Sequence, residues 1–119
     1  MAVLNSGLLA ADGISALEKL AADRIEFDAL AAVNAGIGEA IMLNLPRFNW
    51  RAPEHFSFYS GGAIPGFEDA VPLSTYYSPY RQMGKVAMEM LIDMIEERRD
   101  PAAVEQCKLP ANYVDFQTI

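Results

Sequence analysis

Apolar side chains recur at every third or fourth position in the last third of the chain. This spacing predicts an amphipathic helix over 80–97. We expect Ser78 to cap it, Pro79 to occupy its first position, and Asp100-Pro101 to end it. Its apolar stripe, about four turns long, consists of Met83, Val86, Ala87, Met90, Leu91, Met94 and Ile95. A stripe of this length needs a surface to cover it.

The same spacing predicts two earlier helices, each with a boundary signal. The first covers about 13–22, with Asp12 as its N-cap. The second covers about 36–45 and is broken by Pro46. Asn49 then tolerates the left-handed backbone on which many helices end.

Short apolar runs between the helices predict strands. They lie at 29–33, 56–59 and 73–77, and two extended pieces follow at about 106–109 and 112–116. The run at 29–33 is continuously apolar, as in a parallel strand buried on both faces. Gly61-Gly62 is expected to end the second strand in a flexible turn. Alternating strands and helices predict an α/β protein with a mainly parallel sheet flanked by helices.

Composition narrows the classes of function. The chain has 119 residues, enough for one domain, with 52% hydrophobic and 21% charged residues. Its net charge of −7 disfavours nucleic-acid binding by this chain alone. The single cysteine, Cys107, allows no internal disulfide, and neither a membrane span nor a signal peptide is recognised. We therefore expect a cytoplasmic protein without a membrane partner.

Catalytic and cofactor motifs are not found in the sequence. It has no glycine-rich phosphate loop, and His55 is the only histidine. His55 and Cys107 lack an orienting partner, so neither a metal site nor a nucleophile pair is expected. We expect no enzyme, no cofactor and no metal.

Four motifs in order resemble the effector-binding core of the LacI/GalR family of transcription regulators. They are FDALAAVNAGIGEA at 27–40, APEHFSFYSGGA at 52–63, PLSTYYSPYRQMGKVAMEML at 72–91 and LPANYVDFQT at 109–118. The third matches the family pattern P-L-T-T-V-x-x-P-x-x-x-M-G-x-x-A-x-x-x-L almost residue for residue.

The resemblance implies a partial periplasmic-binding-protein-like subdomain of type I. Residues 1–77 would belong to the C-terminal subdomain, and about 78–109 would form a crossover helix and strand that pack on the other subdomain. The family's helix-turn-helix is not in this chain, so DNA would be bound only through a missing N-terminal domain.

The resemblance also implies a site for a small, sugar-like effector. Asn34, Ser60, Gly62 and Tyr80 would edge the pocket, with Tyr80 as a stacking platform. Gly62 stands where the family usually carries an acid for sugar hydroxyls, and Leu8 where an upstream aromatic is usual. From the residues alone, the favoured interpretation of Asn34 is a turn residue at a strand end, and that of Tyr80 is a tyrosine packed in the first helical turn.

A homodimer contact is implied for the second helix and the segment after the second strand. The residues are Ile41, Met42, Ile64 and Phe67. Two other functions remain open from the sequence. The chain is alternatively a structural fragment that self-associates without a ligand of its own, or part of a periplasmic sugar-binding protein.

Overall fold

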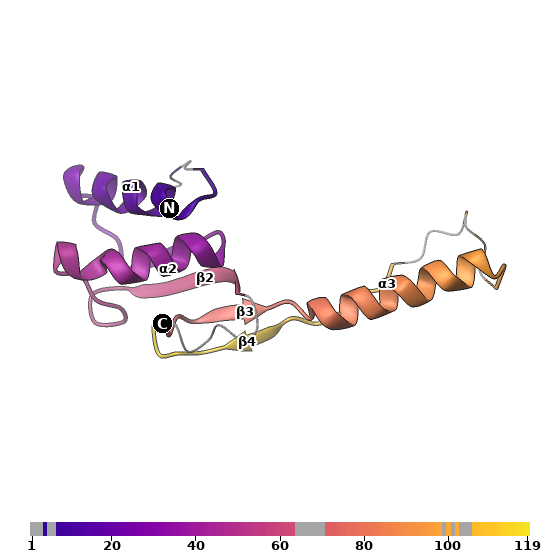
Figure 1. Cartoon of the computed structure of the whole chain (residues 1–119). Helices are drawn as coiled ribbons and strands as arrows, with labels where there is room; N and C mark the ends of the chain where they lie inside the picture. The colour runs from indigo at the N-terminus through magenta and orange to yellow at the C-terminus, as the bar shows by residue number, and fades with distance from the viewer. Residues whose placement is uncertain (1–3, 5–6, 64–70, 99, 101, 103–105) are drawn as a thin grey trace. The chain divides into compact units, whose positions relative to one another are not determined.

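The computed structural model describes residues 4, 7–63, 71–98, 100, 102 and 106–119. Figure 1 labels most of its elements along the ribbon. Their bounds are α1 Ala10–Ala22, β1 Ala29–Ala32, α2 Ala35–Asn44, the 3-10 helix η1 Leu45–Phe48, β2 Ser57–Ala63, β3 Thr75–Tyr77, α3 Tyr80–Ile95 and β4 Asn112–Val114. The predicted α/β class is confirmed.

The chain divides into two compact units. The first unit contains Met1–Tyr77 and Tyr113–Ile119, and the second contains Ser78–Asn112. The sheet and the helices α1 and α2 belong to the first unit, whereas α3 belongs to the second. The roles predicted for 1–77 and 78–109 as subdomain and crossover stay predictions.

The sheet of the first unit has the strand order β1-β2-β3-β4. β1 and β2 pair in parallel with Ala32 opposite Ser60, and β2 and β3 pair in parallel with Ser60 opposite Thr75. A mainly parallel sheet is therefore confirmed. The register between β2 and β3 shifts between Ser60 and Ala63.

The end predicted for the second strand is wrong. β2 continues through both glycines to Ala63 instead of turning after Tyr59. A Cβ built on Gly61 would lie 2.6 Å from the carbonyl oxygen of Val33. Gly61 is thus required by the close approach of the neighbouring backbone and not by a turn.

Helix α1 starts earlier than its pattern predicts. Leu9 occupies the N-cap position, and its backbone N–H donates to the Asp12 carboxylate at 2.8 Å. Asp12 therefore acts from the third position of the helix and is not the N-cap. The carboxylate still lies in the first turn, where the helix dipole favours a negative charge.

Helix α2 ends as its sequence predicts, whereas the start of α3 differs. Pro46 lies in the first turn of η1, and Asn49 takes φ 56° beyond it. In α3, Pro79 is at the N-cap position and no side chain caps the helix. The prediction that Ser78 caps this helix is wrong, and Pro79 precedes the first helical residue, Tyr80, instead of occupying that position.

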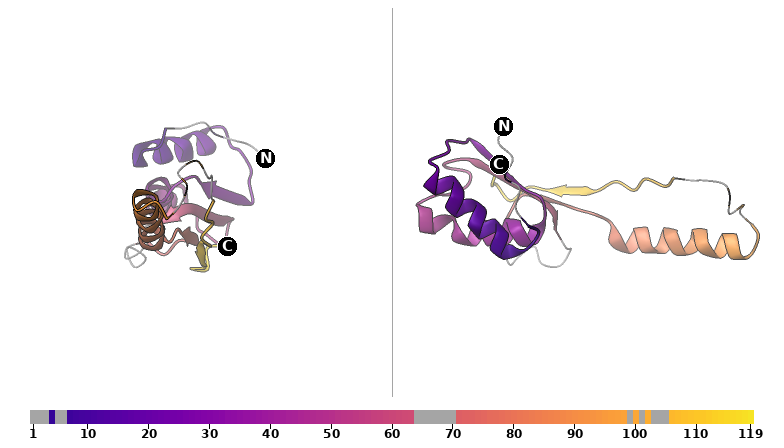
Figure 2. Two further views of the ribbon diagram at one scale, coloured as in Figure 1. Left: turned by 90° about the vertical axis from the view of Figure 1, so that its right-hand side faces the viewer. Right: turned by 90° about the horizontal axis from the view of Figure 1, so that it is seen from above.

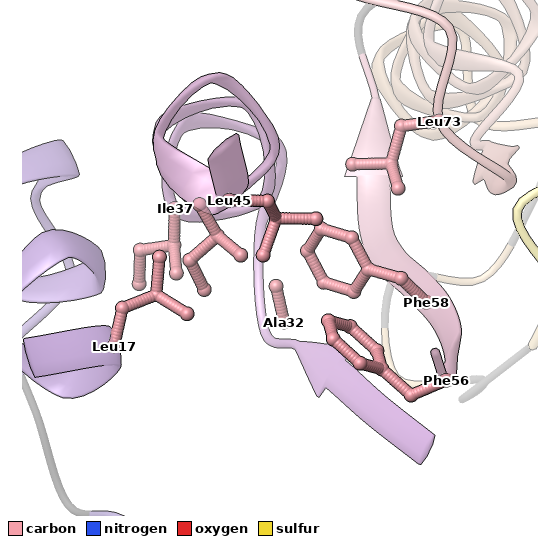
Figure 3. Packing of buried hydrophobic residues seen from close by; sticks show 8 residues of the cluster. Leu17, Ala32, Ile37, Leu45, Phe56, Phe58 and Leu73 are labelled. Carbon is pink, nitrogen blue, oxygen red and sulfur yellow. The ribbon is translucent and has the colours of Figure 1, made fainter. Parts of the chain in front are cut away.

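A single apolar core holds the first unit together (Figure 3). α2 contacts α1 as well as β1 and β2, so it lies between α1 and the sheet (Figures 1 and 2). The buried cluster contains Leu17, Ala32, Ile37, Ile41, Leu45, Phe56, Phe58 and Leu73. Phe27, Phe48 and Trp50 extend it with edge and stacked ring contacts.

The C-terminal residues are tied to the sheet by hydroxyl groups. The Thr118 hydroxyl donates to the Phe58 carbonyl at 2.7 Å and accepts from the backbone N–H of Ser74 at 2.9 Å. The Ser74 hydroxyl donates to Asp115 at 2.8 Å. The extended piece predicted at 112–116 contains β4, but residues 106–109 form no strand.

Candidate functional site

Asn34 lies just past the carboxyl end of β1 and caps α2. Its side-chain oxygen accepts from the Ile37 backbone N–H at 2.9 Å, and its amide nitrogen donates to the Leu8 carbonyl at 3.2 Å. These bonds orient the amide, and its second N–H group has no acceptor among the described residues. The structural reading of Asn34 as a strand-end residue therefore holds, and the amide also has a free donor for a ligand.

Ser60 lies beside Asn34 in space. Its side-chain hydroxyl donates to the Asn34 carbonyl at 3.1 Å, and its own carbonyl accepts from the Thr75 hydroxyl at 2.9 Å. Ser60 is only 1% exposed. Ser60 therefore links β2 to the Asn34 backbone just past β1 and to Thr75 of β3.

Gly62 is the one glycine among the described residues with a positive φ, at 56°. A Cβ built there would lie 3.7 Å from the Tyr76 hydroxyl, which is ordinary contact distance. A side chain at this position thus has room, and its penalty comes from the backbone conformation alone. Asn and Asp bear that penalty better than other residues do.

Tyr80 is the first residue of α3 and belongs to the second unit. Its side chain is 53% exposed, and its backbone N–H donates to the Ser78 carbonyl at 2.8 Å. Both predictions for Tyr80, a stacking platform and a packed tyrosine, stay predictions. An open phenol ring is available for stacking.

The residues predicted for a homodimer contact differ in their surroundings. Ile41 is 4% exposed and packs in the core, so little of its side chain is left for a second chain. Met42 is partly buried against the same core. Ile64 and Phe67 lie outside the described residues, and the contact stays a prediction.

The sequence analysis missed a row of three tyrosines across the sheet. The Tyr59 ring stacks on those of Tyr76 and Tyr113, with centroids 6.4 and 6.3 Å away. Burial raises the pKa of Tyr59, and the phenols of Tyr76 and Tyr113 raise it further. Alternation within FSFY places Tyr59 on the face opposite Phe58, and this was the available signal.

A pocket of 260 Å³ lies where η1 meets the following loop. It is lined by Pro46, Asn49, Trp50, Arg51, Glu54 and His55. The His55 Nδ1 atom accepts from the Arg51 backbone N–H at 3.0 Å, so the imidazole helps to close the loop.

Within the described parts of the chain, no group of three metal-binding side chains lies close together. In those same parts, no helix is long and apolar enough to cross a membrane.

Comparison of the sequence with protein families gives one match. The profile of the periplasmic binding protein-like domain matches residues 4–115, nearly the whole chain. A search of curated proteins finds no significant match.

Several solved structures with the same fold are described as LacI-type regulators. One is a LacI family transcriptional regulator from Arthrobacter sp. FB24 in complex with lactose, with TM-score 0.82 and 21% identity. Another is the Lac repressor bound to ONPG in the repressed state, with TM-score 0.80 and 17% identity. A third is a LacI family regulator from Enterococcus faecium with bound ribose, with TM-score 0.73 and 18% identity.

The similarity covers nearly all of this chain but less than half of each neighbour. For the Arthrobacter regulator it covers 95% of this chain and 43% of that structure. The corresponding shares are 94% and 34% for the Lac repressor, and 97% and 42% for the Enterococcus regulator. The predicted partial periplasmic-binding-protein-like fold is therefore confirmed, and so is its likeness to the effector-binding core of these regulators.

Proposed function

Because this chain belongs to the periplasmic binding protein-like domain family, we propose that it supplies part of the effector-binding core of a LacI-type transcription regulator. The observation that carries the proposal is the position of Asn34. Its oriented amide lies beyond the carboxyl end of β1, the side of an open parallel sheet where ligands usually bind. Two of the structural neighbours hold lactose and ribose, which supports a sugar-like effector.

The proposed role is binding and not catalysis. An effector that binds one conformation of the core more tightly shifts the population toward it, and this changes the affinity for DNA. The operator would be bound by another part of a longer protein, because this chain carries a net charge of −7. A cytoplasmic location belongs to this proposal, since a regulator must reach its operator.

Calorimetry tests the proposal on the longer protein that contains this chain. The ligands are lactose, ribose and a panel of other sugars and nucleosides, and operator affinity is measured with and without each one. We expect heat with at least one compound and a changed operator affinity with the same compound. No heat in the whole panel would contradict the proposal. Heat without any operator effect would favour a periplasmic sugar-binding protein.

Two substitutions locate the effector within the proposed site. Tyr80→Ala removes an exposed ring, and we expect up to about tenfold weaker sugar binding, because a stacking contact contributes roughly 0.5–1.5 kcal/mol. Tyr113→Ala is the matched control, since Tyr113 is 54% exposed but stacks on the sheet instead. Gly62→Asp restores an acid where the family usually has one, and we expect tighter sugar binding. Equal affinities in Tyr80→Ala and Tyr113→Ala would remove Tyr80 from the site.

A second candidate function is self-association without a ligand. The observation that favours it is α3, in which no residue is buried. An apolar helix face of that length normally marks an interface. The mass in solution tests this candidate independently of any ligand, and a chain that stays monomeric would exclude it.

A further inference from the structure

The pocket beside η1 lies away from Asn34 in the first unit. It is formed by η1 and by the loop that leads into the amino end of β2. Trp50 of this loop contacts Phe27, which comes just before β1. Asn34, in contrast, follows the carboxyl end of β1. Because β1 and β2 are parallel, the pocket and Asn34 lie at opposite edges of the sheet. A ligand in the pocket would therefore be additional to the effector proposed above.

Hydrogen bonds and ring contacts hold the walls of this pocket in place. The backbone N–H of His55 donates to the Arg51 carbonyl at 2.9 Å, and the backbone N–H of Arg51 donates to His55 Nδ1 at 3.0 Å. The Trp50 ring stacks on Phe48 at 5.3 Å and meets Phe27 edge-on at 5.4 Å. A site whose walls are fixed before binding loses less conformational entropy when a ligand enters it.

Two side chains of opposite charge line the pocket without an ion partner. Arg51 and Glu54 are both exposed, and neither pairs with the other or with any further residue that the structure describes. Since Nδ1 of His55 is an acceptor, the neutral imidazole carries its proton on Nε2, which also has no acceptor among the described residues. The pocket thus offers donors suited to a carboxylate, and a separate carboxylate suited to a cation.

Volume and net charge restrict what can bind between these groups. The pocket volume of 260 Å³ has room for about nine water-sized groups, so it admits a small molecule only. The net charge of −7 disfavours a ligand that is purely anionic, whereas a zwitterion adds no net charge. Pro46 and Trp50 supply apolar wall surface beside the charged groups.

We propose that this pocket binds a free α-amino acid with an apolar side chain. Arg51 and His55 would hold its carboxylate, and Glu54 would hold its ammonium group. The apolar side chain would lie along Pro46 and Trp50. The site goes beyond the proposed effector function and does not depend on it.

Tryptophan fluorescence of the 119-residue chain tests the proposal. Trp50 is the only tryptophan in the sequence and lines the pocket, so its emission reports on this site. The probes are L-leucine, 4-methylpentanoate, which lacks the ammonium group, and 3-methylbutylamine, which lacks the carboxylate. We expect a saturable change with leucine and binding about fivefold or more weaker with either analogue, because each loses one charged contact. No saturable change at millimolar leucine would overturn the proposal. Equal affinity for leucine and 4-methylpentanoate would overturn the zwitterion and leave an anion site.

Three substitutions locate the leucine within the pocket. Arg51→Gln and Glu54→Gln each remove one charge, and each should weaken leucine binding about fivefold or more. Arg24→Gln is the matched control, because Arg24 is exposed and lies outside the pocket, and it should bind leucine as the wild type does. All three positions are exposed, so thermal melts without leucine should agree with the wild type. Unchanged leucine binding in Arg51→Gln and Glu54→Gln would overturn the proposal. Sugar calorimetry reports on the opposite edge of the sheet, so its outcome is separate.

Discussion

The two units of this chain contain similar apolar residues but use them differently. In the first unit, Ile41 of α2 is almost completely buried among side chains from α1 and the sheet. In the second unit, Ile92 of α3 is 41% exposed, and no residue of that helix is buried. Helical periodicity thus identifies an apolar face in both units, whereas described residues bury that face only in the first.

This difference has a thermodynamic meaning. Most of the stability of a helix in a protein comes from packing of its apolar face, since isolated helices of this length are marginal in water. α1 and α2 receive that stabilisation within the chain. α3 needs another surface for it, and the resemblance of the sequence implies that this surface is the other subdomain of a longer protein.

Replacing the same residue type in the two units gives the largest expected effect. Ile41→Ala should lower the free energy of unfolding by about 2–5 kcal/mol, because it leaves a cavity in the core. Ile92→Ala should change it by no more than about 0.5 kcal/mol, as at other exposed positions. Urea unfolding followed by circular dichroism measures both. Equal losses in the two variants would mean that Ile92 is as well packed as Ile41.

Two glycines of α2 sharpen the comparison within one helix. A Cβ built on Gly38 would lie 2.3 Å from the Ser60 hydroxyl oxygen, whereas on Gly36 it would meet nothing closer than 3.6 Å. Gly38→Ala should therefore destabilise the chain by about 1–3 kcal/mol through overpacking. Gly36→Ala should be neutral or stabilising by up to about 1 kcal/mol, because alanine favours the helix. Thermal melts of both variants decide this, and a stabilised Gly38→Ala would contradict the close packing of α2 on β2.

The hydrogen bonds of Thr118, which tie the C-terminal residues to the sheet, give a smaller expected effect on stability. Thr118→Val keeps the shape of the side chain but removes the hydroxyl that bonds Phe58 and Ser74. We expect a loss of about 1–2 kcal/mol, since the Phe58 carbonyl and the Ser74 N–H lose their side-chain partner. Thr118→Ser retains the hydroxyl and should lose less. Urea midpoints that are lower for Thr118→Ser than for Thr118→Val would show that the methyl group matters more than the bonds.

Local patterns in the sequence predict most of the fold. The three helices follow from periodicity, and Asn49 stops η1 in the left-handed backbone that its side chain tolerates. The end of β2 could not be predicted in this way. Gly61 looks like a turn residue in the sequence, but it is set against the carbonyl of Val33, just past the end of β1. That close approach depends on non-local pairing.

The candidate site shows the same limit. Asn34 could be predicted because it follows an apolar strand and precedes a helix, both of which are local signals. The burial of Ser60 could not, because it depends on Gly38 and on strand pairing. The tyrosine row was also missed, since Tyr59, Tyr76 and Tyr113 come together only through the register of three strands.

The tyrosine row gives the smallest expected effect, and it concerns pH. Burial, with a contribution from Tyr76 and Tyr113, raises the pKa of Tyr59 in the folded chain. Above the ordinary tyrosine pKa of about 10, the unfolded chain therefore loses this proton before the folded chain does. The folded state then holds more protons, so the free energy of unfolding falls as the pH rises toward the folded pKa, and the full contribution is present at lower pH. Urea unfolding from about pH 8 to about pH 11 should show a steeper fall for the wild type than for Tyr59→Phe, which cannot ionise there. Identical slopes would mean that Tyr59 has the same pKa in the folded and unfolded chain.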